Sequence, residues 1–201
     1  MYSLCYNITK SSFASFVVLR SDKMFGFGKI SQPELAKRIV ALAGEASEQF
    51  HDYLKEDSVI YSKCITQTPI KNTGAVFMVN IYRDMLSSKY VDKDVYLVIR
   101  TAILMMGTNK TMQDMLWQCL MDYWKACNDG LDYYKQLPGY DPIAVLTKTY
   151  FSLVFDDRIY LQNELERAIP QSVSYRKIYD YINGVIKHKT LLDDKYKMKL
   201  L

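Results

Sequence analysis

The chain has 201 residues, of which 49% are hydrophobic and 24% are charged, and its formal net charge at pH 7 is +4. This length is enough for one sizeable core and short for two, and the balance is that of a folded protein, so we expect one domain and no extensive disorder. The positive charge is well below what phosphate-backbone binding usually needs, so nucleic acid is not a favoured partner.

The cysteine content indicates free thiols. Cys5, Cys64, Cys119 and Cys127 form no CxxC pair and are too few for a disulfide scaffold. Cys119 and Cys127 lie on one expected helix, about 12 Å apart along its axis, which is too far for a disulfide between them. We therefore expect reduced thiols buried as small hydrophobic side chains, which suits a cytoplasmic location.

No membrane-spanning segment is predicted. The longest apolar run, VYLVIRTAILMMG at 95–107, contains Arg100. It is also shorter than the roughly 20 residues that a helix needs to cross a bilayer.

Three regions are expected along the chain. Residues 1–30 form an N-terminal arm or extension, because the first 23 are rich in serine and β-forming residues and show no helical repeat. Their apolar stretch is short and runs directly into Arg20, which does not suit a signal peptide. They are either an extension ahead of Met24 or an arm against the core. An all-helical domain over 31–189 and a basic tail over 190–201 follow.

The sequence SQPE at 31–34 predicts the start of a helix that runs to about Lys55. Ser31 and Glu34 have the spacing of a capping box, and Pro33 stands in the first turn, where its missing N–H is harmless. Residues 57–90 carry two short apolar runs, SVIYSKCIT and GAVFMVNIY, which fit either strands or buried helices. We favour helices on both sides of Pro69, with a short β-hairpin at 58–82 as the alternative.

Two strongly apolar helices are predicted next, at 92–106 and 111–129. The turn between them is too short for anything but neighbouring helices, so we expect a helical hairpin at the centre of the fold. Thr111 is the expected cap of the second helix. The sequence Asn128-Asp129-Gly130 is its expected stop, because glycine takes the left-handed conformation at a helix end without a steric penalty.

Further helices are expected after the turn at Pro138-Gly139. Asp141-Pro142 has the pattern of a cap followed by proline at the first helical position. After an interruption at Asp156-Asp157, a short helix is expected to end at Pro170, and Ser172 or Ser174 opens the last one. The predicted fold is a single all-α bundle of about six to eight helices.

The chain carries no motif that assigns a reaction. It has no phosphate-binding glycine loop and no GxSxG sequence. Glu48 and His51 have the Glu-x-x-His spacing of di-iron bundles, but the only other histidine, His188, has Val185 three residues before it, so the second motif is missing. We predict no catalytic residue, no metal and no cofactor, and favour a role other than catalysis.

Trp117, Met121 and Trp124 form an apolar stripe at i, i+4 and i+7 on the second hairpin helix. Facing outward, they would offer a patch on which a partner helix can dock; the alternative is that a second layer of the same chain covers them. We predict a protein-interaction module, such as an adaptor, a chaperone-like accessory protein or an inhibitor, whose partner is another protein or a second copy. The alternative function is a helical enzyme or small-ligand-binding protein with an internal pocket lined with aromatic and methionine residues.

Overall fold

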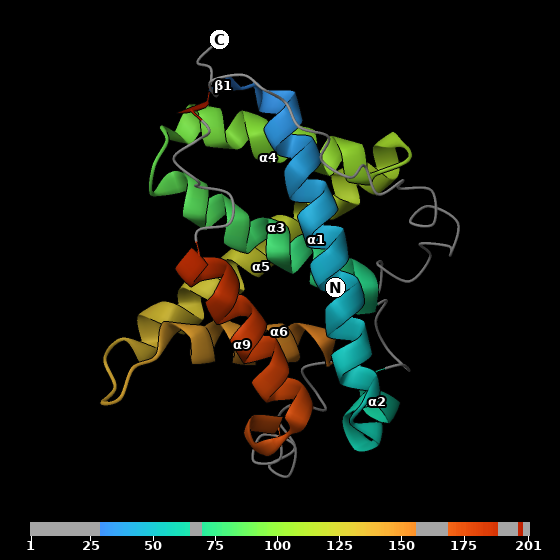
Figure 1. Cartoon of the computed structure of the whole chain (residues 1–201), viewed down its shortest axis with the longest axis vertical. Coiled ribbons are helices and arrows are strands. Elements are labelled where there is room, and N and C mark those ends of the chain that lie inside the picture. Colours follow the sequence, from blue (N-terminus) through green and yellow to red (C-terminus); the bar gives the residue numbers. More distant parts are fainter. Residues whose placement is uncertain (1–28, 65–69, 156–168, 189–196, 199–201) are drawn as a thin grey trace.

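The computed structural model describes residues 29–64, 70–155, 169–188 and 197–198. Within these ranges the chain forms seven α-helices, one 3-10 helix and two strands of two residues each. The predicted all-α bundle is confirmed. The strands, Lys29–Ile30 (β1) and Lys197–Met198 (β2), pair in parallel, so the two ends of the described chain meet beside the start of the first helix (Figure 1).

Helix α1, Gln32–Lys55, runs from the top to the bottom of the molecule in Figure 1, and α2, Ser58–Cys64, follows at its lower end. The predicted capping box is present at the start of α1. The Ser31 side chain accepts a hydrogen bond from the Glu34 N–H, and the Glu34 carboxylate accepts one from the Ser31 N–H at 3.1 Å. This backbone bond stabilises the charged carboxylate and lowers the pKa of Glu34.

Helix α3, Ile70–Ser87, is the most buried helix of the described chain. Residues 73–82 are buried without interruption, which covers this helix on every side for roughly three turns. It packs against α1, α4, α5 and α6. The predicted helices at 58–82 are therefore confirmed where the chain is described, and the alternative β-hairpin is wrong.

The centre of the bundle is α3 rather than the predicted hairpin. Helices α4, Asp92–Met106, and α5, Lys110–Tyr134, are joined by three residues and pack against each other as predicted. Each of them keeps an exposed side, whereas α3 keeps none between residues 73 and 82. The most extensive packing in the bundle joins α1 to α3. Gly74 of α3 lets the two helix backbones approach closely, because a Cβ at that position would lie only 3.2 Å from the Cα of Ser47 on α1.

The C-terminal part of the described chain adds helix α6 (Pro142–Val154), the 3-10 helix η2 (Ile169–Gln171) and helix α9 (Val173–His188). Asp141 caps α6 and Ser172 caps α9, since their side-chain oxygens accept first-turn N–H groups at 2.9 Å and 3.1 Å. Pro170 lies inside η2 and ends no described α-helix. The predicted interruption at 156–157 and most of the predicted short helix lie outside the described residues.

Helix α5 is longer than predicted at both ends. Asn109 caps it instead of Thr111, because its side-chain oxygen accepts the N–H of Met112 at 2.9 Å. At the other end the helix passes through Gly130 to Tyr134, so the predicted stop is wrong. A Cβ on Gly130 would lie 3.3 Å from a methyl group of α6. Close packing against α6 thus offsets the cost of about 1 kcal/mol of a glycine inside a helix.

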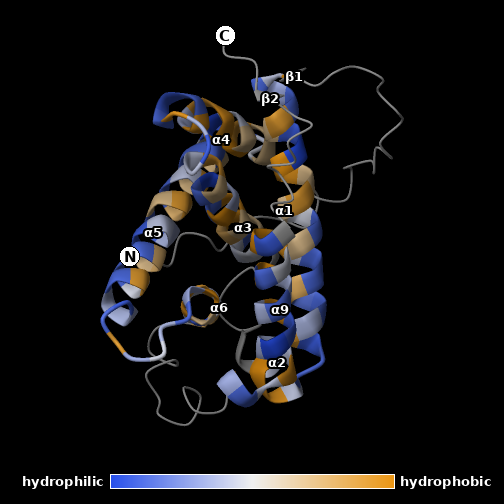
Figure 2. Ribbon diagram, turned by 60° about the vertical axis from the view of Figure 1, so that its left-hand side comes forward, coloured by the Kyte–Doolittle hydropathy of each residue, from blue (hydrophilic) through white to orange (hydrophobic). Residues whose placement is uncertain are grey.

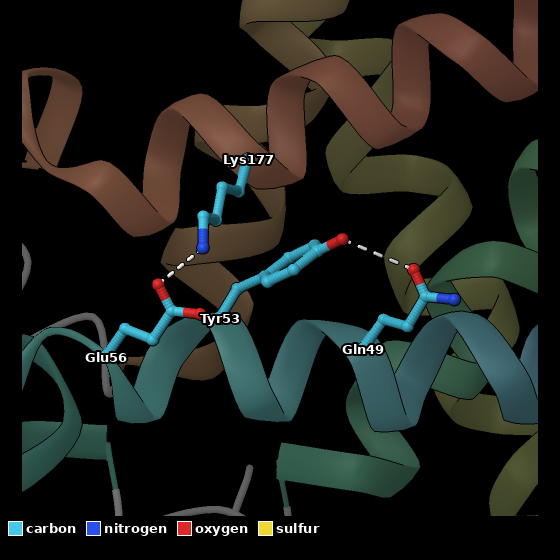
Figure 3. A network of polar contacts seen from close by, with 4 residues as sticks. All are labelled: Gln49, Tyr53, Glu56 and Lys177. Atoms are coloured by element: carbon cyan, nitrogen blue, oxygen red, sulfur yellow. Dashed lines mark hydrogen bonds and ion pairs between the residues drawn. The ribbon is translucent and has the colours of Figure 1, made fainter.

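A polar contact fastens α9 to α1 (Figure 3). Lys177 forms an ion pair with Glu56 and lies 5.3 Å from the ring centroid of Tyr53, whose hydroxyl donates to the side-chain oxygen of Gln49 at 3.3 Å. The paired side chains are 40% and 48% exposed, so the pair stabilises the fold by at most about 1 kcal/mol. Ile178, which is fully buried on α9, contributes more through the removal of apolar surface from water.

The predicted N-terminal arm lies outside the described residues except for β1, and the predicted basic tail lies outside them except for β2. Among the described helices, none combines the length and the apolar character that a bilayer crossing requires.

Candidate partner-binding surface

Helix α4 has an apolar outer face. Its inner face buries Val95, Val98, Ile99, Ala102, Ile103 and Met106. On the opposite side, Leu97 is 38% exposed and Leu104 47%, and at the two edges of the outer face Tyr96 is 47% and Met105 38% exposed. An amphipathic surface helix usually carries polar residues there. We call Tyr96, Leu97, Arg100, Leu104 and Met105 the α4 surface.

Exposed hydrophobic side chains are concentrated here. Of the eleven large hydrophobic residues that are exposed in the described chain, five lie between residues 91 and 105. Figure 2 shows α4 and α5 on the same side of the molecule, with hydrophobic positions recurring along both. Single exposed hydrophobic residues are normal on protein surfaces, but a local concentration of them marks interaction sites.

Arg100 is held across this apolar surface by Tyr96. One guanidinium nitrogen of Arg100 donates to the Tyr96 hydroxyl at 3.2 Å, and the guanidinium carbon lies 6.0 Å from the Tyr96 ring centroid. This hydrogen bond uses one of the five N–H donors of the guanidinium group. Within the described ranges, no ion pair joins Arg100 to a carboxylate.

Tyr96 also connects the α4 surface to the predicted stripe on α5. Its ring meets Trp117 edge to face, with the centroids 5.5 Å apart. Trp117 and Met121 are half-buried against the core, and Trp124 is 37% exposed with the guanidinium of Arg83 only 4.4 Å from its ring centroid. The stripe therefore flanks the α4 surface and is partly covered by α3 and α4. Its role in partner binding stays a prediction.

A polar strip on α5 borders the stripe. Gln118 donates to Asp122 at 3.0 Å, and one turn further on Lys125 forms an ion pair with Asp129. These polar side chains pair with one another at the surface. They have the character of the polar rim that surrounds the apolar part of a protein interface.

Sequence reasoning missed the α4 surface, although a signal for it was present. The run from Val95 to Met106 contains more hydrophobic residues than one helix face can hold. Six of them fill the buried face, so Leu97 and Leu104 have to point elsewhere. Because they are seven residues apart, they lie on the same side of the helix, two turns from each other.

The cysteines of α5 are built into the fold. Cys127 is fully buried, and burial raises the pKa of its thiol to about 12, so almost none of it is ionised at neutral pH. Cys119 is half-buried against the core. Cys5 and the side chain of Cys64 lie outside the described residues.

Glu48 and His51, the Glu-x-x-His pair, lie apart from the α4 surface. Glu48 is exposed on α1, and the His51 ring lies 5.7 Å from that of Tyr61 on α2. The described part of the chain contains no group of three or more His, Cys, Asp or Glu side chains that could hold a metal ion.

Comparison with known proteins returns no relative. No protein-family model matches the chain, and no curated protein or solved structure matches it. The function is therefore inferred from the surface itself.

Proposed function

We propose that this chain is a protein-binding module that receives a helix of another protein on the α4 surface. The observation that carries the proposal is the exposure of Leu97 and Leu104 on the outer side of a helix whose inner side is packed into the core. A helix fixed in this way presents its side chains without further ordering, which lowers the entropic cost of binding. An amphipathic partner helix can bury the two leucines at i and i+7 spacing.

The expected affinity is modest. Full burial of a large apolar side chain stabilises by about 1.5–3 kcal/mol. The four apolar side chains of the α4 surface are already about half covered, so each contributes roughly 1 kcal/mol to binding. Part of this total is offset by the loss of translational and rotational freedom on association. The apolar face of the partner helix contributes a similar amount, so after this offset we expect a weak, reversible complex with a dissociation constant of roughly 0.1–1 mM. Such a complex suits an adaptor, an accessory protein or an inhibitor.

The test uses a displayed library of 18-residue amphipathic helices with leucine on the apolar face, selected for binding to the full chain. We expect the selected peptides to bind the wild-type chain and to bind the double variant Leu97→Ser/Leu104→Ser at least tenfold more weakly, as measured by fluorescence anisotropy. Both leucines face outward, so the circular dichroism spectrum of the variant should match that of the wild type.

The matched control is the double variant Val59→Ser/Val173→Ser. These valines are 62% and 59% exposed on α2 and α9, away from the α4 surface. The control should bind the peptides as the wild type does. Equal binding by the Leu97/Leu104 variant, or a selection that yields no binder, would contradict the proposed function.

A further inference from the structure

The outer side of α4 carries positive charge between its apolar residues. Lys93, Leu97, Arg100 and Leu104 follow one another at i, i+4, i+7 and i+11, so cations and leucines alternate along one line of the helix surface. The two acidic residues of α4 lie off this line: Asp94 is buried, and Asp92 stands at the start of the helix, about 12 Å from Arg100 along the axis. Arg100 is therefore the only charge between the two leucines.

A helix that covers both leucines also covers Arg100. Its guanidinium group would then lose its water, and an unpaired charge in such a place opposes binding more strongly than a leucine contact favours it. The hydrogen bond to Tyr96 satisfies only one donor and supplies no negative charge. A carboxylate on the partner would pair with the guanidinium in the planar, two-bond geometry that arginine favours.

A second copy of this chain does not meet that requirement. In a symmetric dimer the same surface lies on both subunits, and the two-fold axis passes near its middle. The middle of the line from Leu97 to Leu104 is Arg100 and its neighbour, so two Arg100 side chains would face each other. Like charges placed opposite one another disfavour an interface strongly.

On the basis of the proposed function, we infer that the partner is an acidic amphipathic helix. Two apolar side chains of this helix cover Leu97 and Leu104, and an Asp or Glu between them binds Arg100. The interaction is heterologous: a second copy of the chain is not the occupant.

The same displayed library tests the charge of the partner, when the positions beside its leucine face are varied among Glu, Lys and Gln. We expect Glu to be enriched over Lys among the peptides that bind the full chain. The variant Arg100→Glu should reverse this preference, binding the Glu peptides at least tenfold more weakly and the matched Lys peptides more tightly. Its control, Lys37→Glu on the exposed side of α1, makes the same charge change away from the α4 surface and should keep the Glu preference.

Failure of this inference differs from failure of the proposed function. Peptides that depend on Leu97 and Leu104 but show no preference for Glu, or no reversal with Arg100→Glu, would overturn the acidic partner and leave the binding surface in place. Peptides that ignore Leu97 and Leu104 would overturn the proposed function, and the inference with it.

Two further measurements identify other occupants. Light scattering coupled to size exclusion should give the mass of a monomer; a dimer that Leu97→Ser/Leu104→Ser dissociates would place a second copy on the surface and overturn the inference. A photo-crosslinking amino acid at position 104 of the isolated chain should form crosslinks only to nearby residues of the described helices. A crosslink to residues outside the described ranges would show that the chain covers this surface itself, which also overturns it.

Discussion

Cys127 shows at the residue scale what burial does to a reactive group. Its side chain has no exposed surface, and the pKa of the thiol rises to about 12, chiefly through burial and further through the negative charge of Asp84. In the unfolded chain the same thiol has a pKa of about 8.5. The thiol is thus protonated in the folded protein over a pH range in which the unfolded chain ionises.

This difference makes stability depend on pH in the alkaline range. Below about pH 8.5 the thiol is protonated in both states and its contribution to stability is fully present. Above that pH only the unfolded chain loses the proton, so the free energy of unfolding should fall by up to about 1.4 kcal/mol per pH unit until the folded pKa is reached. Urea denaturation at pH 8, 9 and 10 measures this slope.

In the variant Cys127→Ala, the free energy of unfolding should fall less steeply with pH between pH 8.5 and 10, whatever its value at neutral pH. The variant Cys119→Ala serves as the control on the same helix. Tyr181, whose pKa burial raises to about 12, and Tyr82, whose pKa burial also raises, add to the loss only above about pH 10. An unchanged slope in Cys127→Ala would contradict the burial argument.

At the scale of helices, Gly130 and Gly184 differ in how much space surrounds them: Gly130 is closely packed and Gly184 is not. A Cβ on Gly130 of α5 would lie 3.3 Å from Val145 and 3.4 Å from the Thr149 hydroxyl oxygen of α6. That hydroxyl is already held by its hydrogen bond to the Val145 carbonyl oxygen at 3.0 Å, which limits its freedom to move. A Cβ on Gly184 of α9 would meet no atom within 4 Å.

The two alanine variants should therefore differ in stability. Gly184→Ala should raise the free energy of unfolding by about 0.5–1 kcal/mol, because alanine favours the helix and nothing stands in its way. Gly130→Ala should not show this gain, because its methyl group pushes α6 away from α5. Urea denaturation of both variants measures the difference; equal stabilisation would show that α5 and α6 can separate at no cost.

For the whole molecule, α3 is the element on which the other helices pack. Its residues from Thr73 to Tyr82 are all buried, whereas α4 and α5 each keep a solvent-exposed side. Regions with dense burial open only when the protein unfolds globally, while exposed segments open locally.

We expect the backbone amides of residues 75–82 to be the slowest to exchange with deuterium among those of the described helices. Their exchange should speed up with urea as steeply as global unfolding does. The turn at 135–140, where nearly every residue is exposed, should exchange fastest of the described internal segments. Hydrogen exchange followed by mass spectrometry measures both, and slower exchange in α5 than in α3 would contradict the central position of α3.

The candidate surface illustrates what could be predicted for the site. The stripe of Trp117, Met121 and Trp124 was recognisable from its spacing, and it does lie on one side of α5. Two features depend on which helices lie next to α4 and α5. Helices α3 and α4 cover part of the stripe, and Leu97 and Leu104 on α4 are the more exposed apolar residues. Helical spacing says which side chains share a face and not what that face meets.

The sequence by itself determined the helical class and most helix starts. Ser31 and Asp141 cap helices as predicted, and Ser172, one of the two serines predicted for the last helix, caps α9. These predictions succeed because a cap and its first turn are neighbours in sequence and their hydrogen bonds are local. Only the tertiary structure decided that α3 is the centre, that α5 continues through Gly130, and that the outer side of α4 stays uncovered in the described chain. The physical reason is that burial and close approach depend on residues far away in sequence, which propensity and periodicity do not describe.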